Sequence, residues 1–179
     1  MTMTATAVRR QPPGELGERI VFTIGILLVW RVLHHVPLPG LDAGVVNDAL
    51  RHATVAMPER ISVMAIGLTP FISAWAFGEL GRGSYSDAAI ARFRRVATLA
   101  LALFQAIGVT SGLEQVTAAV PEPGLAFRLG AVSSLVGGTM VALWLGETIT
   151  RRGLGDGVWL LLAAQLVTSL PRWLALALE

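Results

Sequence analysis

Long, nearly uncharged apolar stretches recur along this 179-residue chain and constrain its fold more than any other feature. A helix needs about 20 mostly apolar residues to cross the roughly 30 Å hydrocarbon layer of a membrane. Hydrophobic residues make up 54% of the chain and charged residues 15%. Five stretches are long and apolar enough, at residues 20–36, 61–80, 96–113, 126–149 and from 158 past Pro171. The sequence therefore predicts an all-α, polytopic membrane protein with five transmembrane helices.

The two ends of the chain differ in composition. Residues 1–18 are rich in Thr, Pro and Gly and predict a polar, flexible arm, whereas residues 19–179 form the membrane domain. The first apolar stretch ends in two histidines and a Pro-rich turn, not in the small residues of a signal-peptide cleavage site. We interpret it as a retained helix.

All 14 basic residues are arginines, and they gather in short clusters between the apolar stretches. This pattern fits an anionic membrane surface better than a nucleic-acid groove. Basic residues favour the cytoplasmic side of a membrane. Five spans then place the N-terminus in the cytoplasm and the C-terminus outside. Nine arginines mark the cytoplasmic side: Arg9, Arg10, Arg19, Arg82, Arg92, Arg94, Arg95, Arg151 and Arg152.

The fourth stretch carries small residues at every fourth position. These are Gly130, Ser134, Gly138, Ala142 and Gly146. The spacing places them on one helix face, where a neighbouring backbone can approach closely. We therefore expect this helix to be central and tightly packed.

The connection between the fourth and fifth stretches combines charge with backbone freedom. Arg151 and Arg152 hold it at the cytoplasmic face, and Gly153, Gly155 and Gly157 let the chain reverse. A phosphate-binding glycine loop would need a preceding strand, whereas a membrane helix precedes this one. The connection is therefore a tight cytoplasmic loop and not a nucleotide site.

In the second stretch, Pro70 predicts a helix kink, with Gly67 loosening the turn before it. The kink is either an ordinary membrane-helix feature or a hinge or pore lining, because freed backbone groups need protein or water around them.

Catalytic chemistry is not supported by the residues present. There is no cysteine, and His34 and His35 have no third ligand nearby, so we interpret them as an interfacial polar pair. Ser133 has no base in its span. Glu79 and Glu147 lie near span ends, too shallow for a proton relay. We expect no enzyme activity, no cofactor and no metal site.

Four segments together resemble the SecY family, the channel subunit of the Sec translocon. RIVFTIGILLVWRVLHHVPLPGLD resembles its first helix and ISVMAIGLTPFISAWAFGEL the second half of its second helix. RRVATLALALFQAIGVTSGLE resembles its third helix. VSSLVGGTMVALWLGETITRRGLGDGVWLLLAAQLVTSLP resembles its fourth helix, a cytoplasmic loop and its fifth helix. The resemblance covers residues 19–171 and implies a fold equivalent to the N-terminal half of SecY.

The resemblance also implies a pore constriction made of Leu68, Ile72, Val158 and Leu162. Each pair is spaced i, i+4 and so projects from one helix face. An aliphatic ring offers a passing peptide no fixed hydrogen bonds and can lose its water when empty. The alternative is contact with lipid or with neighbouring helices.

The chain departs from the family in four respects. It stops after the fifth of ten helices, the plug segment within residues 41–60 is short, and Asp156 stands where the family has Asn. The second-to-third connection is short as well.

The resemblance implies protein translocation across, or insertion into, the bacterial cytoplasmic (inner) membrane by a non-enzymatic half-channel. Its expected partners are membrane lipid, a second half-channel (a homodimer or another membrane subunit), other Sec translocon subunits and an unfolded or signal-bearing polypeptide, with no nucleic acid. The alternative is an accessory, assembly or degenerate subunit that binds a membrane partner without conducting. A small-solute transporter ranks below both, because no span carries a charge at mid-depth.

Overall fold

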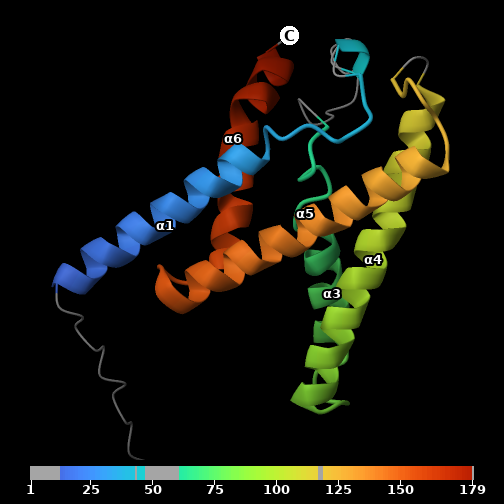
Figure 1. The fold of residues 1–179 in the computed structure, drawn as a ribbon. Helices are drawn as coiled ribbons and strands as arrows, with labels where there is room; N and C mark the ends of the chain where they lie inside the picture. The colour runs from blue at the N-terminus through green and yellow to red at the C-terminus, as the bar shows by residue number, and fades with distance from the viewer. Residues whose placement is uncertain (1–12, 43, 47–60, 117–118, 179) are drawn as a thin grey trace, which may run out of the picture.

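The computed structural model describes residues 13–42, 44–46, 61–116 and 119–178. Helix α5 crosses the molecule and packs against α1, α4 and α6, while α3 packs along α4 (Figure 1). The prediction that the fourth apolar stretch forms the central helix is therefore confirmed. The helices in chain order are α1 (Pro13–Leu33), α3 (Thr69–Leu80), α4 (Asp87–Gln115), α5 (Leu125–Arg152) and α6 (Gly157–Leu178).

The helices differ in how well they satisfy the requirements for crossing a membrane. In the described ranges, α4 and α5 are long and apolar enough by length and composition, and Gly157–Val167 of α6 is a shorter apolar helix. The fold is thus helical with two clear candidate spans, and crossing by the other three stretches stays a prediction.

The second apolar stretch is not one helix, which corrects the sequence prediction. Residues 61–68 are non-helical, and α3 begins only at Thr69. Pro70 therefore lies in the first turn, where its missing N–H costs no helical hydrogen bond, and the predicted kink is wrong. Gly67 turns the chain into the helix with a φ of +56°. Most of the expected plug segment, and residues 1–12 of the arm, lie outside the described residues.

The non-helical segment keeps its backbone satisfied by pairing with the chain that follows α1. The Val63 N–H donates to the Val36 carbonyl at 3.1 Å, and the Leu38 N–H donates to the Ile61 carbonyl at 3.3 Å. Irregular backbone is tolerated at membrane depth only where protein or water surrounds it. These contacts therefore allow residues 61–68 to lie inside the helical bundle.

Helices α3 and α4 form a hairpin, and Arg94 of α4 holds the two helices together through contacts with α3. The Arg94 guanidinium contacts the Glu79 carboxylate at 2.5 Å and lies 5.9 Å from the Trp75 ring centroid. Its side chain passes over Gly78, where a Cβ would come within 2.6 Å of the Arg94 Nε. Ser86 caps the start of α4 by accepting a hydrogen bond from the Ala89 N–H at 3.3 Å.

The small-residue face of α5 contacts backbone over part of its length. Gly138, Ala142 and Gly146 are buried, Ser134 is half-buried and Gly130 is exposed with open space beside it. A side chain at Gly138 would collide with the carbonyl of Val63. The face thus admits the non-helical segment against the middle of α5.

We expect Gly138→Leu to destabilise the fold by at least about 1–3 kcal/mol, the usual cost of overpacking, because the new side chain meets backbone that cannot rotate away. Gly137→Leu is the matched control, since Gly137 is exposed with no atom within 4 Å of a Cβ position. Thermal unfolding in mild detergent measures the difference. Equal unfolding temperatures for the two variants would show that the segment does not press on α5.

Candidate functional site

Three of the four residues predicted for the pore constriction meet in one apolar cluster. Leu68 is the residue just before α3. It is only 2% exposed and belongs to the same cluster as Met64 and Leu161. Val158 and Leu162, one turn apart at the start of α6, pack against that cluster. The start of α3 and the start of α6 thus contribute to one apolar contact.

The fourth predicted residue, Ile72, lies one turn into α3 and is half-buried. Its N–H donates to the Leu68 carbonyl at 3.1 Å, which continues the helix from the cluster. Ile72 is not among the residues that pack against the cluster. The structure therefore places three of these side chains in or against one apolar cluster and the fourth one helical turn away from Leu68.

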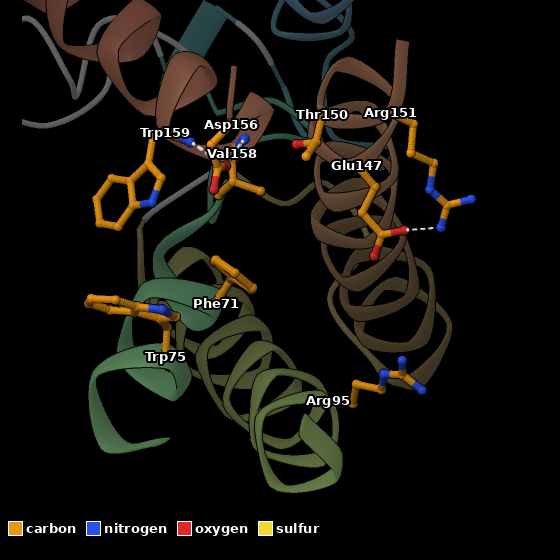
Figure 2. Close-up of a pocket in the computed structure, with 9 residues that line it drawn as sticks. All are labelled: Phe71, Trp75, Arg95, Glu147, Thr150, Arg151, Asp156, Val158 and Trp159. Atoms are coloured by element: carbon orange, nitrogen blue, oxygen red, sulfur yellow. Dashed lines mark hydrogen bonds and ion pairs between the residues drawn. The ribbon is translucent and has the colours of Figure 1, made fainter. Parts of the chain in front are cut away.

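A hollow of about 320 Å³ lies beside this cluster (Figure 2). Trp75 of α3 and Trp159 of α6 meet edge to face on one side of it, with ring centroids 5.5 Å apart. Val158 lines the hollow and also contacts the apolar cluster, so the two are adjacent. The complete lining is Phe71, Trp75, Arg95, Glu147, Thr150, Arg151, Asp156, Val158 and Trp159.

The aromatic pair was missed by the sequence reasoning. Trp75 lies in SAWAF, shortly after Pro70, and Trp159 lies in GDGVW, at the end of the glycine loop. Their positions next to these two features were the only sequence evidence that could have drawn attention to them. Their contact depends on α3 and α6 being neighbours, which no local pattern shows.

Polar bonds set the direction in which α6 leaves the loop. The Gly157 N–H donates to the Thr150 hydroxyl oxygen at 2.8 Å, and this hydroxyl donates to the Gly146 carbonyl at 3.0 Å. Asp156 accepts a hydrogen bond from the Val158 N–H at 3.1 Å and so caps the helix. The Asp therefore positions Val158 in the candidate constriction.

The loop glycines serve two different purposes. Only Gly155 has a left-handed backbone, with a φ of +62°. Gly157 is needed for close approach, because a side chain there would collide with the Gly146 carbonyl and the Ile149 side chain. The sequence predicted that all three glycines permit chain reversal. In the structure only Gly155 makes the turn, whereas Gly153 and Gly157 allow neighbouring atoms to approach closely.

A hydrogen bond to α1 fastens the loop. The Leu154 N–H donates to the Thr23 hydroxyl oxygen at 3.1 Å, and that hydroxyl donates to the Arg19 carbonyl at 2.7 Å. Thr23 is only 4% exposed, and a Cβ at Gly153 would come within 2.5 Å of its hydroxyl oxygen. This link joins residues 131 positions apart, and sequence reasoning did not identify it.

The charged and polar groups singled out from the sequence have local partners. Glu147 pairs with Arg151 at 3.2 Å on an exposed surface, where such pairs contribute about 0–1 kcal/mol. The Nδ1 atoms of His34 and His35 lie 3.0 Å and 2.9 Å from carbonyls of the preceding helical turn. In the described part of the chain, no three His, Asp or Glu side chains gather as a metal site would require.

We expect Thr23→Val to loosen the loop by about 1 kcal/mol, because it leaves the Leu154 N–H without its acceptor while keeping the side-chain volume. Trypsin cleavage after Arg152 should accelerate accordingly. Thr148→Val is the control, since the Thr148 hydroxyl bonds only to the Trp144 carbonyl of its own helix. Unchanged cleavage in Thr23→Val would argue that this bond does not hold the loop.

The sequence matches known translocase subunits. The protein translocase subunit SecY of Escherichia coli (strain K12) is 36% identical over 192 residues, which cover 93% of this chain and 43% of that protein. SecY of Buchnera aphidicola subsp. Acyrthosiphon kondoi is also 36% identical, and 54% of it is covered. The chain thus spans about half the length of these relatives.

Solved structures share the fold. A SecY structure concerned with the plug domain superimposes with a TM-score of 0.65 at 15% identity, covering 87% of this chain and 36% of that one. Sec61 from a canine ribosome–channel complex gives a TM-score of 0.59 at 15% identity, covering 83% and 36%. A family model described as SecY matches residues 62–178, more than half of the chain. The chain therefore belongs to the SecY family.

Proposed function

We propose that the chain forms one half of the wall of a protein-conducting channel and takes part in moving unfolded or signal-bearing polypeptide across or into the bacterial inner membrane. The observation that carries this proposal is the meeting of Leu68, Val158 and Leu162, which come from segments far apart in the sequence. The similar proteins from Escherichia coli and Buchnera aphidicola, which are protein translocase subunits, support it.

The apolar cluster supplies the physical basis of the proposed seal. Aliphatic side chains hold no fixed hydrogen bonds to a passing backbone, and a narrow apolar gap excludes water when no peptide fills it. Ile72 extends this surface along α3. The adjacent hollow, with its aromatic walls and charged rim, forms the approach to the seal. Such a site needs no catalytic group and no cofactor.

A second half completes the proposed channel wall. Large apolar side chains on α3 and α6 are exposed, among them Phe77, Leu80 and Val167. The second half comes from another membrane subunit or from a second copy of this chain. An inverted copy would have to insert in the opposite orientation, and the nine-to-five distribution of arginines favours one orientation. We therefore favour a different subunit.

The proposed topology follows from the same arginines. Figure 1 shows the α3–α4 and α5–α6 connections toward one end of the molecule and the end of α6 toward the other. Arg82, Arg92, Arg151 and Arg152 belong to the first end and would lie in the cytoplasm.

Reporter fusions check this topology. A fluorescent protein fused before Thr4 should be bright, because it folds in the cytoplasm, and a phosphatase fused after Glu179 should be active, because it folds outside. The swapped pair of fusions is the control and should be silent. Equal signals from all four fusions would indicate dual topology and would favour the homodimer.

Cross-linking tests the channel itself. Because the chain has no cysteine, Ile72→Cys and Leu162→Cys each create a single thiol. Both should form a disulfide with a cysteine in a polypeptide stalled during translocation, in membranes that contain the partner subunits. Phe104→Cys, on the exposed face of α4, is the control and should form none. Cross-linking at Phe104 alone, or at none of the three with assembly confirmed, would favour the accessory-subunit alternative.

A further inference from the structure

Two contacts fix how α6 runs past α3 and the residues just before it. Trp75 and Trp159 meet edge to face, with ring centroids 5.5 Å apart (Figure 2). Further along α6, the Gln165 amide lies beside Gly67, where its Oε1 atom would be 3.6 Å from a Cβ. Going back along the chain from Trp75 to Gly67 therefore corresponds to going forward from Trp159 to Gln165. The two segments run antiparallel to each other.

This antiparallel register places Ile72 and Leu162 at the same level. Ile72 lies three residues before Trp75, and Leu162 lies three residues after Trp159. A helix rises about 1.5 Å per residue, so both positions lie about 4.5 Å from the level of the tryptophan pair. Residues spaced i, i+3 are also neighbours on a helix surface. The tryptophan pair therefore lies one turn from the level that carries a predicted constriction residue on each helix.

Neighbouring groups hold both members of the tryptophan pair in place. The Arg94 guanidinium lies 5.9 Å from the Trp75 ring centroid and pairs with the Glu79 carboxylate, which ties this ring to α4. The Trp159 N–H donates to the Asp156 carboxylate at 3.5 Å, in the cap that starts α6. An edge-to-face aromatic pair also attracts beyond the area that it buries. The contact therefore joins two positions that are themselves anchored.

We infer that Trp75 and Trp159 are positioning residues that set the separation of α3 and α6 at the level of Ile72 and Leu162. The indole rings are rigid and resist closer approach, whereas their attraction resists separation. Aliphatic contacts alone hold helices weakly in a membrane, because lipid tails offer equivalent contacts. The inference rests on the proposed function for its purpose, which is to keep the seal at a fixed width. The separation itself is a property of this chain.

Thiol cross-linkers of graded length measure this separation in the full chain in membranes. Because the chain has no cysteine, Ile72→Cys with Leu162→Cys creates one pair of thiols. Adding Trp159→Leu should lower the yield with the shortest effective cross-linker about two- to tenfold, the population change expected from losing an aromatic pair. Trp159→Phe keeps an aromatic ring and should restore most of the yield. Trp144→Leu removes an exposed tryptophan of α5 outside the pair and should leave the yield unchanged.

A second pair of thiols shows whether the whole fold has loosened. Glu114→Cys with Arg128→Cys replaces an ion pair between α4 and α5. Cross-linking of this pair should be the same with and without Trp159→Leu. Loss of cross-linking at both thiol pairs would overturn the inference, because the tryptophan would then stabilise the fold in general. Equal yields at Ile72→Cys with Leu162→Cys, whether residue 159 is Trp or Leu, would overturn it as well.

Ion conductance separates this inference from the proposed function. In planar bilayers that contain the partner subunits, Trp159→Leu should raise the resting conductance and Trp144→Leu should not. A changed separation of α3 and α6 with unchanged conductance would support the positioning role and contradict the proposed seal. An unchanged separation would contradict the positioning role whatever the conductance.

Discussion

The small size of the residues on one face of α5 is the constraint on which the rest of the fold depends. At Gly138 the helix meets the Val63 carbonyl, and at Gly146 it meets the backbone of Gly157 and Val158. Lipid tails are as apolar as leucine, so burial alone does not drive membrane helices together, and close backbone packing matters more than in water. Both segments that carry the candidate constriction are positioned by these contacts with α5.

The contact at Gly138 requires a broken helix, and the break has to be satisfied locally. A helix through residues 61–68 would carry side chains all around its axis, whereas the observed irregular backbone lies flat against α5. Its freed groups bond to Val36 and Leu38. Pro70 then starts α3 at no hydrogen-bonding cost, because the first turn has unpaired N–H groups in any case. Leu68 consequently lies at the helix entrance, within reach of α6.

The sequence predicted α5 well and α3 poorly, for a physical reason. The sequence predicts a helix over residues 126–149, and α5 spans Leu125–Arg152. The prediction succeeds because this stretch is apolar and carries a small residue at every fourth position over many turns. Residues 61–80 were equally apolar, but apolarity alone does not separate a buried helix from a buried irregular segment. The link from Thr23 to Leu154 and the pair of Trp75 with Trp159 arise only from tertiary packing. The constriction residues came from family resemblance, since i, i+4 aliphatic pairs are common in any membrane helix.

Neutral and charged groups have different roles around the α5–α6 connection. Buried neutral bonds define its shape: the Thr23 hydroxyl holds Leu154, and the Thr150 hydroxyl holds Gly157. Each is worth about 1 kcal/mol and is little affected by salt. The ion pair of Arg151 with Glu147 is exposed and contributes less to stability. The shape of the loop therefore rests on the buried hydroxyl bonds, and the exposed charges of Arg151 and Glu147 contribute little to it.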